Sequence, residues 1–136
     1  MDNTLSSDKI IPEEIESFFD DYIRAFSKRD VKYIMENIYN NPISIVKGGT
    51  VIPLNDSAII EKSLVDGFNQ LNAVGYDHTI KNNLENLQEQ ADNKITITLN
   101  YSRLDKQHQF IGDKEIRTKY SLERKDTGYR IAQIIL

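Results

Sequence analysis

Several features that define whole classes of proteins are missing from this sequence. Its 136 residues contain no cysteine, which excludes a disulfide framework, a thiolate nucleophile and a cysteine-bound metal. No segment approaches the ~18 consecutive apolar residues of a membrane-spanning helix. The first ten residues, MDNTLSSDKI, lack the apolar core of a secretory signal. We therefore expect a soluble cytoplasmic protein with no membrane partner.

A strong charge of either sign is missing too. Seventeen basic and twenty-one acidic residues leave a formal net charge of −4. Such a chain exerts no long-range attraction on nucleic acid, so we expect no nucleic-acid partner. Its length corresponds to one domain that can bury a core without disulfides or metals.

The motifs of common catalytic centres are scarce as well. The chain has two histidines, and His78 cannot form a metal pair with Asp77 because adjacent strand residues point to opposite faces. The segment Lys47–Thr50 lacks the spaced glycines of a phosphate-binding loop and is interpreted as a turn. No Gly-x-Ser-x-Gly nucleophile elbow is present. The sequence therefore predicts neither a metal nor a cofactor.

The first part of the chain carries helical patterns. Residues 1–11 predict a flexible tail, after which Pro12 suits the first turn of a helix. The apolar side chains that follow recur at helical spacing and are Ile15, Phe18, Phe19, Tyr22 and Phe26. Asp30 is a suitable N-cap for a second, shorter helix, which we expect Pro42 to end.

A hairpin and a third helix come next. Within residues 43–54, the pair Gly48-Gly49 supplies the positive φ angles of a tight turn. Asn55 or Asp56 then caps a helix whose apolar stripe contains Gly67. A glycine at this place costs roughly 1 kcal/mol relative to alanine, so we expect close packing against another element there.

In the second half of the chain the apolar period changes to two, which is typical of strands with one buried face. The first inward set is predicted to be Tyr76, His78, Ile80, Asn82 and Leu84. Leu87 breaks this alternation, which indicates a bulge near Asn86. Later strands place Tyr101, Arg103 and Tyr120 on inward faces.

Helices followed by an antiparallel meander indicate an α+β fold. We expect a conical barrel in which three N-terminal helices pack on one strongly curved antiparallel sheet, all within a single domain of residues 12–136. The last strand, residues 129–136, carries apolar side chains on both faces. This pattern predicts a homodimer formed through the sheet, with Ile134 in the interface.

Two stretches carry a resemblance to a known family, FFDDYIRAFSKRDVKYIMENIY near the start and SLERKDTGYRIAQIIL at the end. Through them, residues 12–136 resemble the nuclear transport factor 2-like superfamily, including its SnoaL-like and ketosteroid isomerase-like members. The resemblance implies a conical α+β barrel, an interior pocket for an apolar small molecule and frequent homodimers. The superfamily contains enzymes, ligand binders and assembly modules, so the fold alone does not determine the function.

The resemblance to the isomerases also implies particular residues. Isomerase chemistry needs a carboxylate base and two donors that stabilise a developing oxyanion. The helix-one tyrosine of the isomerases corresponds to Tyr22. Their catalytic aspartate corresponds to Lys47, which is no carboxylate base. Their second donor corresponds to Ser121, which we expect to point away from the core. Steroid-type isomerisation is therefore disfavoured.

The polar side chains on the predicted inward faces are the candidate ligand-binding residues. They are Tyr22, His78, Tyr101, Arg103 and Tyr120. Tyr22 lies at the centre of its helical stripe, so its hydroxyl needs a buried partner, for which the histidine and the other two tyrosines are candidates. Arg103 and Arg124 are predicted at one edge of the sheet. There they either extend into water or attract an anionic ligand such as a carboxylate.

Two functions remain open from the sequence. One is a protein that binds a small molecule in an interior pocket. Its ligand would be apolar or carry a carboxylate. As an enzyme it would be a lyase, isomerase or cyclase, with its reaction unassigned. The other is a non-catalytic binding or dimeric assembly module, which the missing carboxylate base favours. An open cavity lined by inward polar groups would support the first, and a packed interior would support the second.

Overall fold

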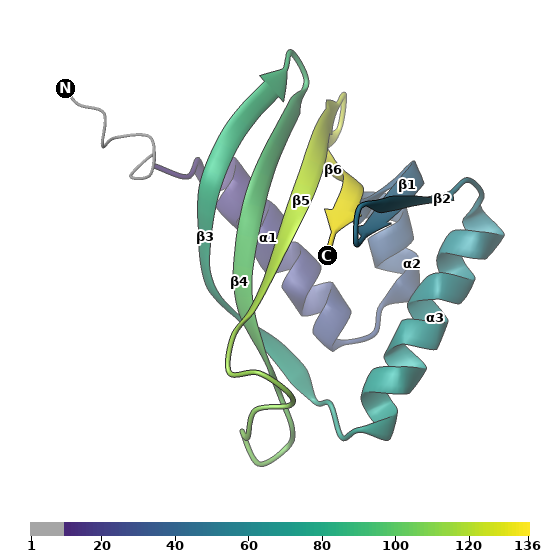
Figure 1. The fold of residues 1–136 in the computed structure, drawn as a ribbon, viewed down its shortest axis with the longest axis vertical. Coiled ribbons are helices and arrows are strands. Elements are labelled where there is room, and N and C mark those ends of the chain that lie inside the picture. Colours follow the sequence, from purple (N-terminus) through teal and green to yellow (C-terminus); the bar gives the residue numbers. More distant parts are fainter. Residues whose placement is uncertain (1–9) are drawn as a thin grey trace.

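The computed structural model describes residues 10–136, which form helices and one sheet (Figure 1). The elements are α1 (Glu13–Ser27), α2 (Val31–Tyr33), the π-helical turn η2 (Ile34–Ile38), β1 (Tyr39–Lys47), β2 (Thr50–Leu54), α3 (Ser57–Ala73), β3 (His78–Ala91), β4 (Lys94–Leu104), β5 (Ile116–Lys125) and β6 (Gly128–Ile135). Most of the predicted tail lies outside the described residues. Among these elements, no helix combines the length and the apolar composition needed to cross a bilayer.

The six strands lie in the order β2-β1-β6-β5-β4-β3. Neighbouring strands are antiparallel except β1 and β6, which are parallel. Figure 1 shows α1 crossing the long strands on one face, with α3 beside α2 and the β1–β2 hairpin. The α+β class with three N-terminal helices on a curved sheet is confirmed. The sheet is mostly antiparallel and open, since β2 and β3 form its two edges.

The core lies between α1 and the concave face of the sheet. Phe19 of α1 is fully buried, and it faces Ile97 of β4 and Leu122 of β5, which are fully buried too. The helix forms because its apolar side chains recur on one side while glutamates occupy its first turn. Burying each large apolar side chain contributes roughly 1.5–3 kcal/mol, so the apolar stripe fixes α1 on the sheet.

The predicted bulge in β3 is confirmed. The register between β3 and β4 shifts between Glu85 and Gln88, and Asn86 within this shift has a φ of 58°. Asparagine tolerates this left-handed conformation better than most residues because its short polar side chain bonds locally. The bulge keeps both Leu84 and Leu87 buried although they are three residues apart.

A second bulge in β3 changes the predicted wall of the interior. At Asn82, two residues of β3 oppose one of β4. An inserted residue reverses the face of every side chain on one side of it. His78 therefore pairs with Leu104 on the outer face, and Thr79 pairs with Arg103 on the inner face. The predicted inward position of His78 is wrong for this reason.

A similar irregularity in β6 moves Ile134. The pairing of β5 with β6 skips Ala132, so Ile134 lies opposite Tyr120 on the inner face. Its side chain packs against the core, while Ile135 lies opposite Lys119 on the outer face. The predicted position of Ile134 in an outer interface is wrong because the skipped residue reverses the alternation.

The segment after α1 forms a shorter helix than the sequence predicts. Asp30 caps it as expected, accepting a hydrogen bond of 3.1 Å from the Tyr33 backbone N–H. The helical segment ends at Ile38, and Pro42 lies inside β1, where the pairing with β6 is irregular. Proline is tolerated in strands at such irregular places. The prediction that Pro42 ends the helix is therefore wrong.

The β1–β2 hairpin and the start of α3 agree with the sequence. Gly48 and Gly49 turn the chain with φ angles of 57° and 82°. Asp56 caps α3 by accepting a hydrogen bond of 2.9 Å from the Ile59 backbone N–H. The expected close packing at Gly67 is wrong, because no atom lies within 4 Å of the place that a Cβ would take. This glycine borders an open space on the inner side of α3.

Candidate functional site

Four tyrosines from four elements meet where α1 crosses the sheet. They are Tyr22 of α1, Tyr39 of β1, Tyr101 of β4 and Tyr120 of β5, and none is more than 9% exposed. We call them the tyrosine cluster. The helical stripe directs Tyr22 toward the sheet, and strand alternation directs Tyr101 and Tyr120 toward the helix. The predicted inward positions of Tyr22, Tyr101 and Tyr120 are confirmed.

Three of the four hydroxyls of the cluster have buried partners. The Tyr22 hydroxyl lies 3.3 Å from the Tyr39 hydroxyl. The Tyr101 hydroxyl lies 3.1 Å from the Thr118 hydroxyl. The Tyr22 ring meets the Tyr120 ring edge-on, with 6.0 Å between their centroids. The predicted buried partner of Tyr22 exists, but it is Tyr39, which was not among the candidates.

Burial controls the protonation of the cluster. Loss of hydration raises the pKa of Tyr22 well above its usual value, and the neighbouring Tyr39 raises it further. The pKa of Tyr39 is also raised, mainly by burial. Burial, with a smaller contribution from Tyr22, likewise raises the pKa of Tyr120. At neutral pH these hydroxyls are therefore hydrogen-bond donors and poor bases.

Three members of the cluster border a small space, the inner cavity, of about 30 Å³. Its walls are Tyr22, Ile23, Phe26, Thr79, Leu99, Tyr101, Arg103 and Tyr120. This volume accommodates about two water molecules and no organic molecule. The interior of the fold is therefore almost filled, although the residues around its remaining space are unusually polar for a core.

A larger space, the mouth pocket, opens on the α3 side of the inner cavity and has a volume of about 300 Å³. Its walls are Phe26, Tyr39, Ser63, Leu64, Gly67, Phe68, Gln70, Leu71 and Arg103. Phe26 and Arg103 border both spaces and so form the partition between them. The Phe26 ring packs on Phe68 of α3 with 4.8 Å between centroids. The mouth pocket thus combines the apolar side chains of Phe26, Leu64, Phe68 and Leu71 with polar ones, and the arginine lies at its partition with the inner cavity.

Arg103 and Arg124 do not share an edge of the sheet. Because β4 and β5 are antiparallel, their C-terminal ends lie at opposite ends of the sheet. Arg124 is exposed and donates hydrogen bonds of 2.6 and 3.2 Å to the Glu14 carboxylate. Its guanidinium carbon lies 4.4 Å from the centroid of the Tyr129 ring. The predicted common position of the two arginines is wrong, and Arg103 alone faces the interior spaces.

His78 lies outside both spaces. Its Nδ1 is 2.8 Å from a carboxylate oxygen of Asp77, and its ring centroid is 5.0 Å from that of His108. The described residues contain no group of three or more His, Cys, Asp or Glu that could hold a metal ion. Of the five predicted ligand-binding residues, the structure thus brings together Tyr22, Tyr101, Arg103 and Tyr120.

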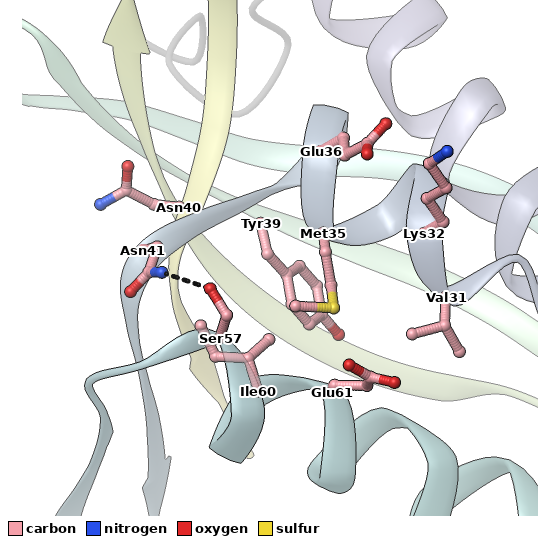
Figure 2. A pocket seen from close by; sticks show the side chains of 10 residues that line it. All are labelled: Val31, Lys32, Met35, Glu36, Tyr39, Asn40, Asn41, Ser57, Ile60 and Glu61. Carbon is pink, nitrogen blue, oxygen red and sulfur yellow. Dashed lines mark hydrogen bonds between the residues drawn. The ribbon is translucent and has the colours of Figure 1, made fainter.

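A third hollow of about 580 Å³ lies between α2, η2, β1 and the start of α3. Figure 2 shows the thioether of Met35 and the ring of Tyr39 at its floor, with Glu36 and Glu61 at its rim. The rim glutamates are exposed to water and do not converge on one point. This hollow is larger than the mouth pocket, but its glutamates are exposed and the Asn41 amide already donates to the Ser57 hydroxyl at 3.3 Å.

The chemistry available at the tyrosine cluster is donation of hydrogen bonds. The hydroxyls and the guanidinium of Arg103 can hold a carbonyl or an oxyanion. Within the described residues, no Asp, Glu or His borders the inner cavity or the mouth pocket. These walls therefore offer no side-chain base for proton abstraction, but they offer several donors that can bind an electron-rich group.

Comparison with known proteins places this geometry in a family. Residues 13–136 match the family model described as NTF2-like protein (DUF6841). No curated protein matches the chain.

Among solved structures, Aln2 from a Streptomyces species is similar at 14% sequence identity with a TM-score of 0.69, covering 93% of this chain and 91% of that one. An NTF2-like protein with a cystatin-like fold from Novosphingobium aromaticivorans has 14% identity and a TM-score of 0.67, with coverage of 90% and 78%. The de novo designed NTF2 fold protein NT-9 has 15% identity and a TM-score of 0.57, with coverage of 93% and 85%. At such identities the likeness shows the fold alone.

Proposed function

Because the chain belongs to the NTF2-like protein family DUF6841, we propose that it is a small-molecule-binding protein whose ligand enters between α3 and the sheet. The proposal is supported by the wall that the two interior spaces share. Arg103 and Phe26 border both the mouth pocket and the inner cavity, so a ligand in the mouth pocket lies against the guanidinium and next to the polar groups of the inner cavity. Ligand sites typically combine such apolar walls with a few convergent polar groups.

The walls suggest how a ligand would lie. Its apolar body would pack against Phe26, Leu64 and Phe68, and its polar end would meet Arg103. A volume of about 300 Å³ is at the lower end of the range for small-molecule sites. A lyase, isomerase or cyclase reaction would require a base from the ligand or from water, because the described wall residues offer none. The reaction is therefore left unassigned and binding is the proposed activity.

Filling the mouth pocket tests the proposal. Gly67→Leu adds a side chain at a place that borders the mouth pocket and where an added Cβ would have no atom within 4 Å. Helix propensity favours the change by roughly 0.5–1 kcal/mol, so the variant is expected to fold. We expect it to weaken binding of 2-naphthamide, an apolar aromatic probe, at least tenfold, as measured by NMR titration.

Two matched variants on the same helix control this test. Gly67→Ala adds one methyl group and should retain most of the binding, and Val65→Leu enlarges a side chain that is 39% exposed. Binding that survives Gly67→Leu, or the absence of any shift at residues of α1 and α3 in the wild-type protein, would exclude the mouth pocket as the site.

Assembly through the sheet is a second candidate function, supported by an apolar row on its outer face. Val51 pairs with Val46, and Val46 pairs with Ile135, so the three side chains cross β2, β1 and β6 in line. Val51 is 54% exposed, and Val46 and Ile135 are partly exposed. Contiguous exposed apolar side chains of this kind are common in protein interfaces.

A homodimer through this row has a direct test. Light scattering at micromolar concentration should give twice the chain mass, and Val51→Glu should give the mass of one chain. The substitution lies at the exposed edge of the sheet and is expected to leave the fold intact. A single-chain mass for the wild-type protein contradicts the dimer and leaves the binding proposal unaffected.

A further inference from the structure

Arg103 carries an unsatisfied donor at the place where the two interior spaces meet. Its Nε is buried and has no hydrogen-bond partner within the described residues. It is also the one charged side chain among the described residues that border the inner cavity or the mouth pocket. A guanidinium in a protein stays positive at every physiological pH, so the charge cannot be relieved by losing a proton.

The surroundings of Arg103 compensate its charge only in part. Its guanidinium carbon lies 5.6 Å from the centroid of the Tyr101 ring, within the range of a cation–π contact. A ring face accepts no strong hydrogen bond from Nε. An unpaired buried donor on a charged group is more unfavourable than an unpaired neutral one. A ligand that brings an acceptor with negative charge would satisfy both the donor and the charge.

The neighbouring hydroxyls favour the same kind of ligand. Tyr22, Tyr101 and Tyr120 border the inner cavity together with Arg103. Their hydroxyls can donate to an acceptor, Tyr22 and Tyr101 by turning from their present partners Tyr39 and Thr118. An ammonium group would be repelled by the positive charge of Arg103 in this region. A ligand with a neutral apolar end would leave Nε without a partner.

We infer that the ligand of this pocket is an organic carboxylate with an apolar body, whose carboxylate accepts hydrogen bonds from Arg103 and whose body lies in the mouth pocket. The inference rests on the proposed function. An arginine fork matches the two oxygens of a carboxylate. The inner cavity, of about 30 Å³, has room for about two oxygen-sized groups, which suits a planar carboxylate better than a tetrahedral phosphate.

The test compares two probes of nearly equal shape, 2-naphthoate and 2-naphthamide, which differ in charge at one end. Binding to the wild-type protein is measured by isothermal calorimetry. The Arg103 Nε–H resonance is followed by NMR in parallel and is assigned by its loss in Arg103→Lys. We expect the carboxylate to bind about ten- to hundredfold more tightly than the amide, because hydrogen bonds to charged groups are stronger. The Nε–H resonance should shift when the carboxylate binds.

Two variants separate charge from geometry. Arg103→Met keeps a long apolar side chain and should remove the preference for the carboxylate while binding of the amide persists. Arg103→Lys keeps the charge without the fork and should retain only part of the preference. Arg24→Met is the matched control, since Arg24 is exposed and pairs only with Asp21 at 2.9 Å in the described chain.

The outcomes distinguish the inference from the proposed function. Tighter binding of the carboxylate that disappears in Arg103→Met supports both. Equal binding of the two probes to the wild-type protein overturns the inference and leaves the pocket in place. A carboxylate preference that survives in Arg103→Met also overturns it, because another group must then carry the recognition. Failure of both probes to bind overturns the proposed function and the inference with it. The wild-type comparison requires no variant to fold.

Discussion

At pH 11 the free energy of unfolding will be about 4 kcal/mol lower than at pH 8, because three buried tyrosines must remain protonated in the folded state. In the unfolded chain each hydroxyl ionises with a pKa near 10. Burial raises the folded pKa of Tyr22, Tyr39 and Tyr120, so ionisation favours the unfolded state. Their stabilising contribution is complete below about pH 10 and is lost as the pH rises toward the folded values.

Denaturant unfolding at a series of pH values will measure this loss, with tyrosinate absorbance near 295 nm recorded on the same samples. Tyr120→Phe removes one of the three hydroxyls and should reduce the slope of stability against pH above pH 10 by about 1.4 kcal/mol per pH unit. Ile23→Val controls for general destabilisation, since it should lower stability equally at every pH. Ionisation of all seven tyrosines near pH 10 in a protein that is still folded would contradict the prediction.

Arg29→Met, which removes the guanidinium that follows α1, will destabilise the fold by about 2–4 kcal/mol. Arg29 donates to the Tyr76 and Asp77 carbonyl oxygens at 2.6 and 2.7 Å. It also donates to the Asn72 side-chain oxygen at 2.9 and 3.2 Å, and to the Ser27 carbonyl. One side chain thus joins the end of α1, the end of α3 and the start of β3. In Arg29→Met the two partly buried carbonyls would lose their donor.

Urea unfolding of Arg29→Met will measure the effect, and Arg29→Lys will show how much depends on the fork. Lysine keeps the charge but cannot reach three elements at once, so we expect most of the loss to remain. Arg24→Met, which breaks the exposed pair with Asp21, should change stability by less than about 0.5 kcal/mol. Equal effects of the Arg29 and Arg24 substitutions to Met would show that the contacts of Arg29 contribute no more than an exposed ion pair.

Sequence patterns predicted those parts of the fold that depend on local spacing. The stripe from Ile15 to Phe26 defines α1 because side chains three and four residues apart share one face of a helix. The alternation of strands β4 and β5 is equally local. The parallel pairing of β1 with β6 joins residues about ninety positions apart, such as Ile45 and Ile134. Neither strand carries a local signal for the other, so this pairing was not predictable.

Two of the three register shifts in β3 show where the alternation rule fails. The bulge at Asn86 is visible in the sequence because Leu84 and Leu87 are both apolar and cannot share a face without it. The bulge at Asn82 is hidden because the inward residues before it are polar. One of them, Lys81, points inward yet reaches the carboxylates of Glu16 and Asp20, each at 2.6 Å. Lys81 buries its aliphatic stem and pairs its charge, so a polar residue occupies an inward position. The apolar pattern of the sequence therefore does not reveal this position.

The same limits apply to the candidate site. Tyr22, Tyr101 and Tyr120 were predictable because each lies at a regular inward position of its element. Tyr39 was missed because it stands at the junction of η2 and β1, where neither the helical nor the strand period applies. Arg103 faces the interior spaces without Arg124, because β4 and β5 run in opposite directions and Arg124 therefore lies at the other end of the sheet.

The bulge at Asn82 also bears on how such a protein can diverge. Loss of this one residue would leave Lys81 opposite Tyr101 and Asn83 opposite Asn100, so the strand would become regular and no side chain would change its face. Thr79 would keep its place in the wall of the inner cavity. A deletion elsewhere in β3, where no extra residue absorbs it, would instead turn the segment on one side of it over. A bulge thus lets a strand change its length by one residue without altering the walls of its pocket.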